Sequence, residues 1–126
     1  MLTVAPGCEL DVERGPGWLL VRIANLNDVV AESVPLADQL WSVLQRHFTY
    51  RLVLELDQLQ VLNSFLVGQL IQLHQRIEAS GGVLRLCGLS PRSRRVMRTC
   101  RLAERFPPYR NREEAVMGCR RFRQPK

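Results

Sequence analysis

The sequence predicts an α/β fold with a mixed four- to five-stranded sheet and about four helices mainly on one face. Three observations support this prediction. The chain opens with a hairpin pattern, later strand-like segments are separated by helical ones, and three of the strand-like segments carry a charged residue at mid-length. Helical links imply parallel pairing and a hairpin is antiparallel, so the sheet should be mixed. The predicted order of elements is ββαβαβα(β)α.

Four segments have the pattern of strands. Cys8–Glu13 alternates apolar and acidic residues, a period of two that is typical of a half-buried strand. Arg14–Gly17 has the composition of a tight turn, and Trp18–Ala24 is the returning strand. Tyr50–Asp57 and Val83–Cys87 are the third and fourth strands.

The first helix is expected after Ser33 and Pro35, because a proline costs nothing in the first turn of a helix. Its apolar residues recur at helical spacing and form one stripe. The stripe contains Ala37, Leu40, Trp41, Leu44 and Phe48.

The second helix is expected from the Asn63-Ser64 cap to about Ala79, and the Gly81-Gly82 pair ends it. Its buried stripe contains Leu66, Leu70, Leu73 and Ile77, and is widened by Val67 and Ile71.

The third helix is expected to begin at Ser90-Pro91 and run to roughly Arg101, with Val96, Met97 and Cys100 as its apolar residues. The two prolines in 106–109 predict an extended segment. A last helix should begin at Asn111, which has capping-box spacing to Glu114, and end near Cys119.

Arg22, Glu55 and Arg85 are charged residues in the middle of predicted strands. A sheet covered on both faces seldom accepts such residues. One face should therefore be partly open, which would allow a homodimer.

A chain of 126 residues is long enough for one domain, and we expect a single domain over 1–126, with an ordered core over about 6–119 and a basic tail over 120–126. The N-terminal residues lack the pattern of a secretory leader, and no apolar stretch reaches the length of a membrane span. These features favour a cytoplasmic location.

The net charge of +6 is unevenly distributed. Residues 1–78 carry 5 basic and 9 acidic side chains, whereas residues 79–126 carry 13 basic and 3 acidic ones. The basic half is compatible with nucleic acid, an anionic membrane or an acidic protein as a partner.

Cysteines and histidines are too scattered for a metal site, which needs closely spaced ligands. We therefore expect no metal, no cofactor and four reduced, mostly buried thiols. The residues concerned are Cys8, Cys87, Cys100, Cys119, His47 and His74.

The segment from Tyr50 to Val116 carries a family resemblance. It contains a strand that ends in an acidic residue, a polar-Ser pair that opens a long helix, a Gly-Gly turn, a Gly-Leu-Ser-Pro link and an Arg-rich helix. This succession resembles a STAS domain of the anti-sigma-factor-antagonist type. With weaker similarity upstream, the resemblance covers about nine-tenths of the chain.

The resemblance implies a non-enzymatic regulatory module that binds a protein partner, such as a serine-kinase-like anti-sigma factor, and is switched in many members by serine phosphorylation. The position that matches the phosphorylated serine is Ser64. A helix N-terminus accommodates an added phosphate, which carries about −1.5 to −2 charges. The alternative is that Ser64 is only a helix cap or first-turn residue.

The chain departs from the family pattern in two ways. Asn27 and Asn63 replace aspartates that are usual in the family, which removes two negative charges near the candidate switch. Phe65 and Leu66 replace small residues that commonly follow the serine. Phe65 is therefore either an exposed anchor for a partner or a part of the core.

The partner-binding surface is expected to join the loop at 25–28, the start of the second helix and the start of the third. The third helix is rich in arginine, which forms either an anion-facing surface or an ordinary solvated face. The candidate partner-binding residues are Asn27, Asn63, Ser64, Phe65, Leu66, Ser90, Arg92 and Arg95.

Two other functions remain open: a STAS-type scaffold or transport-complex subunit without phosphorylation, and an anion- or nucleic-acid-binding protein that uses the Arg-rich helix. Aromatic residues make up only 6% of the chain, which disfavours nucleic-acid binding through base stacking. The sequence contains no phosphate-binding glycine loop, no HExxH and no GxSxG motif. We therefore expect no enzymatic activity and no catalytic residues.

Overall fold

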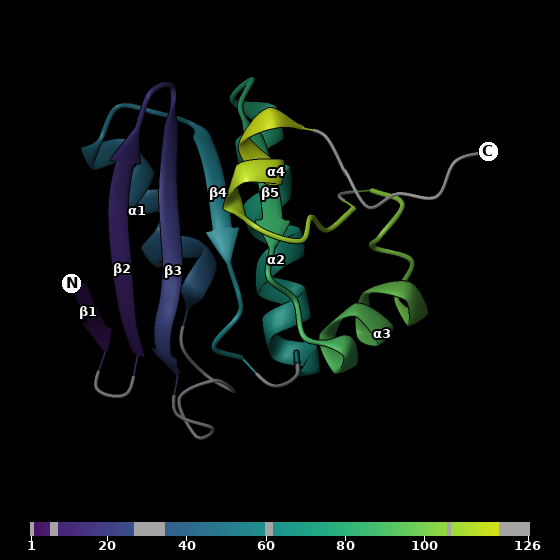
Figure 1. Cartoon of the computed structure of the whole chain (residues 1–126). Coiled ribbons are helices and arrows are strands. Elements are labelled where there is room, and N and C mark those ends of the chain that lie inside the picture. Colours follow the sequence, from purple (N-terminus) through teal and green to yellow (C-terminus); the bar gives the residue numbers. More distant parts are fainter. Residues whose placement is uncertain (1, 6–7, 27–34, 60–61, 106, 119–126) are drawn as a thin grey trace.

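The computed structural model describes residues 2–5, 8–26, 35–59, 62–105 and 107–118 (Figure 1). These residues form one five-stranded sheet with the strand order β1-β2-β3-β4-β5. The first three strands pair antiparallel, and β3, β4 and β5 pair parallel, so the predicted mixed sheet is confirmed. The strands are β1 (Leu2–Ala5), β2 (Cys8–Gly15), β3 (Trp18–Leu26), β4 (Arg51–Glu55) and β5 (Val83–Cys87).

The predicted hairpin is β2 and β3, with a two-residue turn between them. Gly17 in this turn has φ of +74°, a left-handed conformation that favours glycine. The strand β1 was not predicted, because four residues are too few to establish a period.

Two helices cover one face of the sheet and a third lies on the other. In Figure 1, α1 and α2 lie behind the sheet and α4 lies in front of it, over β4 and β5. The predicted helical layer on one face is thus confirmed for α1 and α2, with α4 as the exception. The helices are α1 (Leu36–Arg46), α2 (Ser64–Ala79), α3 (Pro91–Thr99) and α4 (Arg112–Met117).

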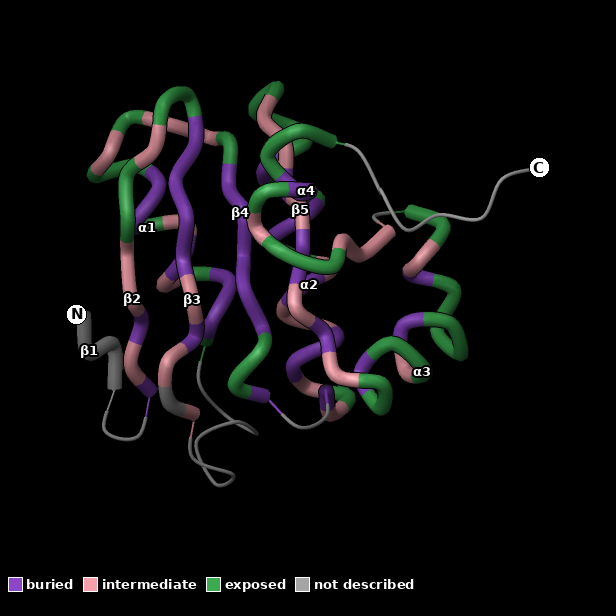
Figure 2. Tube along the Cα trace, viewed as in Figure 1, coloured by how far each residue is buried: buried purple, intermediate pink, exposed green. Residues whose placement is uncertain are grey.

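The sheet has a large core on the side of α1 and α2 and a small one under α4. The large core joins the inward residues of every strand from β2 to β5 to both helices. The small core consists of Trp18, Leu20, Val53, Cys87 and Ala115. Because β4 lies between the two cores, four of its five residues are buried, as the purple trace in Figure 2 shows.

The predicted stripe of α1 is correct up to Leu44 and wrong for Phe48. The helix ends at Arg46, and Phe48 follows it with φ of +54° and 89% of its surface exposed. The chain must reverse there to enter β4, and the left-handed residue that makes this turn points its side chain into solvent. Ser33 lies outside the described residues, while Pro35 occupies the N-cap position of α1.

The ends of α3 and α4 also differ from the prediction. Helix α3 stops at Thr99, so Cys100 is exposed and Leu102, which is 2% exposed, fills the core instead. Helix α4 begins as predicted, with the side chain of Asn111 accepting a hydrogen bond from the N–H of Glu114 at 3.0 Å. The carboxylate of Glu114 accepts a bond from the backbone N–H of Arg110, not from that of Asn111.

Candidate functional site

The start of α2 presents the candidate switch residue to solvent. Asn63 is the N-cap, and its side-chain oxygen accepts a hydrogen bond from the N–H of Leu66 at 2.8 Å. Ser64 is the first helical residue and is exposed. The capping role therefore belongs to Asn63, which leaves the Ser64 hydroxyl accessible.

The residues that follow Ser64 have different surroundings. Leu66 is 2% exposed and belongs to the large core, so the prediction that it contacts a partner is wrong. Its helical spacing to Leu70 and Ile77, which also pack in the core, explains this burial. Phe65 is half-buried and thus presents part of its ring at the surface.

The first turn of α2 has no acidic residue. The N–H groups of a first turn have no intrahelical acceptor, and they form the positive end of the helix dipole. In α2 the N–H of Leu66 is satisfied by the cap side chain. Negative charge added at Ser64 would therefore meet favourable electrostatics and no acidic side chain of the same turn.

The start of α3 has a similar cap. The Oγ atom of Ser90 accepts a hydrogen bond from the N–H of Ser93 at 3.1 Å, and Pro91 occupies the first turn. Arg92 and Arg95 in this turn and the next are exposed.

The sheet topology brings these helix starts to one end of the molecule. Helix α2 follows the carboxyl end of β4, and α3 follows the carboxyl end of β5. Because β3, β4 and β5 are parallel, their carboxyl ends lie at the same edge of the sheet, and Figure 1 shows both helix starts there. The strand β3 also ends there, at Leu26, but Asn27 lies outside the described residues.

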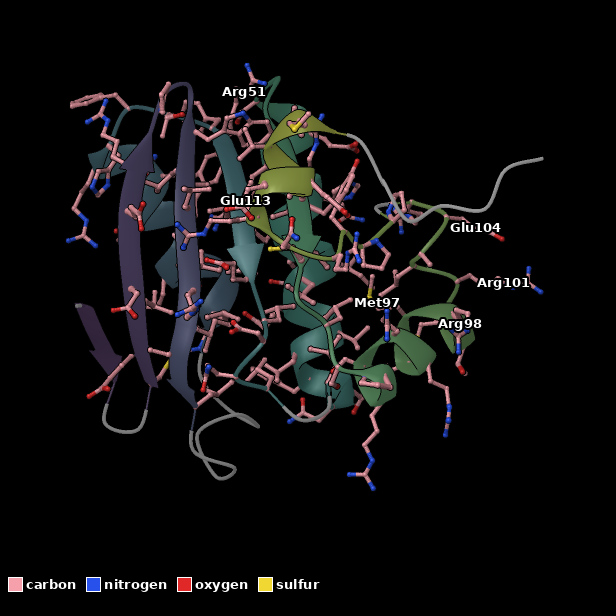
Figure 3. All side chains as sticks on the ribbon, in the orientation of Figure 1. Arg51, Met97, Arg98, Arg101, Glu104 and Glu113 are labelled. Carbon is pink, nitrogen blue, oxygen red and sulfur yellow. The ribbon has the colours of Figure 1, made fainter. Side chains whose placement is uncertain are left out.

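Helix α3 and the turn just after it carry a cluster of exposed arginines, here called the α3 arginine surface. In Figure 3, the labelled Arg98 and Arg101 point away from the body of the protein, whereas Met97 of the same segment is fully buried. No ion pair joins any of these arginines to an acidic residue within the described part of the chain. The surface consists of Arg92, Arg94, Arg95, Arg98 and Arg101.

The mid-strand charges form ion pairs on the face that carries α4. Glu55 lies 3.7 Å from Arg22, and Asp57 lies 3.2 Å from the same guanidinium group. The main partner of Glu55 is Arg112 at the start of α4, which the sequence did not indicate. Among the described residues Arg85 forms no ion pair with either acid, and it donates to the backbone oxygen of Ala115 at 2.7 Å.

Both carboxylates on this face take part in ion pairs. Each of the two acids faces a guanidinium group, which is the arrangement of a salt-bridged surface. In the described residues no three His, Cys, Asp or Glu side chains converge as metal ligands would. None of the helices in the described part of the chain has both the length and the apolar content that crossing a bilayer requires.

The described cysteines differ in burial, and they should therefore differ in reactivity. Burial, and then the charge of Glu55, raises the pKa of the Cys87 thiol from 9.0 to about 12. Burial also raises the pKa of Cys8, with a smaller contribution from Glu9. Cys100 is exposed, so the expected burial holds for two of the three described thiols.

Alkylation should therefore discriminate among these thiols. Only the thiolate reacts with iodoacetamide, and a thiol with a pKa of about 12 is only about one-thousandth ionised at pH 9. At this pH we expect Cys100 to be modified in the folded protein and Cys87 only after denaturation, as read by peptide mass spectrometry. Equal rates for the two in the folded state would contradict the burial of Cys87. Because the unfolded thiol ionises near pH 9, the stability gained by burying the neutral form should be lost as pH rises from 9 towards 12.

Several proteins of known structure share this architecture. A search of curated proteins gave no match. The fold is similar to an anti-sigma factor antagonist from Mycobacterium paratuberculosis, with a TM-score of 0.73, 20% identity, and 94% of this chain and 99% of that chain covered. A putative anti-sigma factor antagonist from Thermotoga maritima gives a TM-score of 0.73 at 18% identity, covering 88% of this chain and 94% of the other. The anti-sigma factor antagonist SpoIIAA in its unphosphorylated form gives 0.68 at 18% identity, covering 92% and 100%.

At these identities the structural matches establish the fold. The family model described as the STAS domain matches the sequence itself, over residues 10–115, and this range includes β3 to β5, the starts of α2 and α3, and most of α4. This chain belongs to the STAS domain family.

Proposed function

We propose that this protein is a non-enzymatic regulatory module of the anti-sigma-factor-antagonist type, which binds a protein partner in the cytoplasm through the end of the sheet where α2 and α3 begin. The observation that carries the proposal is the exposed Ser64 at the first position of α2. The structural similarity to anti-sigma factor antagonists supports the same class of function. The proposed partner is a serine-kinase-like anti-sigma factor or another regulatory protein.

The binding surface would consist of Ser64 and Phe65 from α2 together with Arg92 and Arg95 from α3. Ser64 and the two arginines are exposed, and Phe65 is half-buried. An aromatic ring held partly in the protein is a low-entropy anchor, and exposed arginines add hydrogen bonds at the rim of an interface. Asn63 and Ser90 would act as caps that fix the two helix starts.

Phosphorylation of Ser64 would switch this surface. A phosphate adds about −1.5 to −2 charges and can break a packed or acidic interface. The protein itself would tolerate the modification, because the positive end of α2 and the uncharged Asn63 lie next to it. Asn63 retains the capping bond that an aspartate would make, so the difference from the family pattern is one of charge.

Affinity purification with Ser64 variants tests the proposal. We expect Ser64→Ala to retain the partner and Ser64→Asp to weaken binding by tenfold or more, because the added carboxylate must be desolvated at the interface. Ser42→Asp is the matched control, since Ser42 is an exposed serine in the middle of α1. Isotope-labelled affinity purification measures the ratios, and phosphopeptide mapping after incubation with the co-purified kinase locates the phosphate. Phosphate only at other serines, or equal partner recovery for all variants, would contradict the role of Ser64.

The α3 arginine surface supports a second candidate function, the binding of an anionic macromolecule. Its five guanidinium groups have no acidic partner within the described residues. Affinity for nucleic acid or an acidic membrane would fall steeply with salt. Binding of random-sequence DNA or anionic vesicles by the wild type at physiological salt, lost in Arg98→Gln, would favour this candidate over the first.

A further inference from the structure

The edge of β5 that faces away from β4 is not paired with another described strand of the sheet. In the parallel ladder with β4, the alternate residues Val83, Arg85 and Cys87 direct their backbone groups to β4. Two bonds of this set are Val83 N–H to Tyr50 oxygen and Leu56 N–H to Cys87 oxygen, both at 3.0 Å. The intervening residues, Leu84 among them, therefore direct their N–H and C=O groups outwards.

Only part of this edge is covered. The N–H of Tyr109 donates to the oxygen of Leu86 at 2.8 Å, and the N–H of Gly88 donates to the oxygen of Tyr109 at 3.2 Å. Continued by two residues, this ladder would place residue 107 opposite the oxygen of Leu84. That residue is Pro107, which has no N–H to donate.

The edge groups of Leu84 are thus left without a partner among the described residues, although the residue is only 4% exposed. Buried backbone groups are nearly always hydrogen-bonded, to protein, water or ligand. A cavity of about 200 Å³ lies at this point and reaches around the edge from α2 to the face that carries α4. The cavity is therefore a place where a polar molecule gains hydrogen bonds that the protein itself cannot supply.

Groups of both charges line the cavity. Arg105 is exposed and forms no ion pair with any described acid, so it is available to a carboxylate. Glu78 lies 3.3 Å from the buried His74 and, with the oxygen of Leu84, offers acceptors to a donor group. The neighbouring Arg85 is already occupied, because it donates to Ala115.

The volume of the cavity indicates the size of its ligand. A cavity volume of about 200 Å³ suits a small molecule. This volume is smaller than the roughly 300–1,000 Å³ that is typical of sites for drug-sized ligands. A ligand that matches this lining carries one carboxylate and, close to it, one N–H or O–H donor.

We propose that this cavity, at the free edge of β5, binds a small α-amino or α-hydroxy acid. The carboxylate pairs with Arg105. An amino group donates to both Glu78 and the oxygen of Leu84, and a hydroxyl group, which has one proton, donates to one of them. The site is separate from the partner surface, since Glu78 and Ser64 are fourteen residues apart on α2, a distance of about 21 Å along the helix.

Titration of the ¹⁵N-labelled protein tests the proposal. The probes are the individual proteinogenic amino acids, lactate and malate, with acetate and inorganic phosphate as anions that lack the paired donor. We expect saturable shifts of the Leu84 amide with at least one probe below about 10 mM, ten times the concentration that gives half-saturation at a 1 mM dissociation constant. Absence of saturable shifts with all probes overturns the proposal, and so does equally tight binding of acetate or phosphate.

Two variants connect the binding to the residues named. Arg105→Gln should weaken it about tenfold, the usual effect of losing a charge-assisted hydrogen bond, whereas the exposed Arg101→Gln outside the cavity should not. Pro107→Val restores an N–H opposite the oxygen of Leu84, so it should abolish binding and raise the unfolding midpoint. Equal losses in the two arginine variants, or wild-type affinity in Pro107→Val, contradict the site.

Discussion

Substitution of Gly82 by alanine is expected to lower the free energy of unfolding by about 3 kcal/mol, the upper range for overpacking in a fixed environment. A Cβ atom at this position would lie 2.1 Å from the backbone oxygen of Tyr50 and 2.9 Å from Cγ2 of Ile77. Movement of the Tyr50 oxygen is opposed by its hydrogen bond from the N–H of Val83 at the start of the β4–β5 ladder. Relief of the clash therefore requires breaking the junction between α2 and β5.

Gly68→Ala is the matched control for this prediction. Gly68 lies inside α2, and a Cβ there meets no atom within 4 Å beyond its chain neighbours and the nearby backbone of its own helix. Alanine in a helix interior is favoured over glycine by about 1 kcal/mol, so this variant should be more stable than the wild type. Urea denaturation followed by circular dichroism gives both values. Wild-type stability for Gly82→Ala would mean that the turn before β5 can shift freely.

Local patterns were sufficient to predict most elements of the fold. The β2–β3 hairpin, the start of α2 at its Asn63-Ser64 cap and the span of β5 depend on turn residues, caps and periodicity that lie within a few positions of one another. The exposed position of Ser64 followed from the same signals. Leu66 departs from the family pattern but lies in the apolar stripe of α2, and its burial follows from the stripe.

The remaining features depend on contacts that are distant in sequence. The position of α4 on the second face depends on Ala115 meeting strand residues, and on the contact of Arg112 with a glutamate 57 positions earlier. The cavity at the β5 edge depends on the bridge between Cys87 and Tyr109, beyond which the ladder is not continued within the described part of the chain. Periodicity contains no information on either, because it describes one element at a time.

Loss of the pair between Arg112 and Glu55 is expected to destabilise the protein. Glu55 is 7% exposed, and Arg112 donates to it through two nitrogen atoms while a third contact of this side chain reaches Glu13 at 3.0 Å. These hydrogen bonds, first with Glu55 and then with Glu13, raise the pKa of the Arg112 guanidinium above its usual value. In Arg112→Met, Glu55 would retain only the more distant Arg22.

A buried charge that loses its partner costs about 3–5 kcal/mol, and we expect about 2 kcal/mol here because Arg112 is 27% exposed. Arg76→Met is the matched control. Arg76 pairs with Asp38 at 2.9 Å, but Asp38 is 70% exposed. The loss of unfolding free energy in this variant should therefore stay below about 1 kcal/mol. The double variant Glu55→Gln with Arg112→Met should recover part of the loss, because it removes the orphaned charge. If the losses in unfolding free energy of the two single variants simply add in the double variant, apolar contacts, and not this ion pair, hold α4 on the sheet.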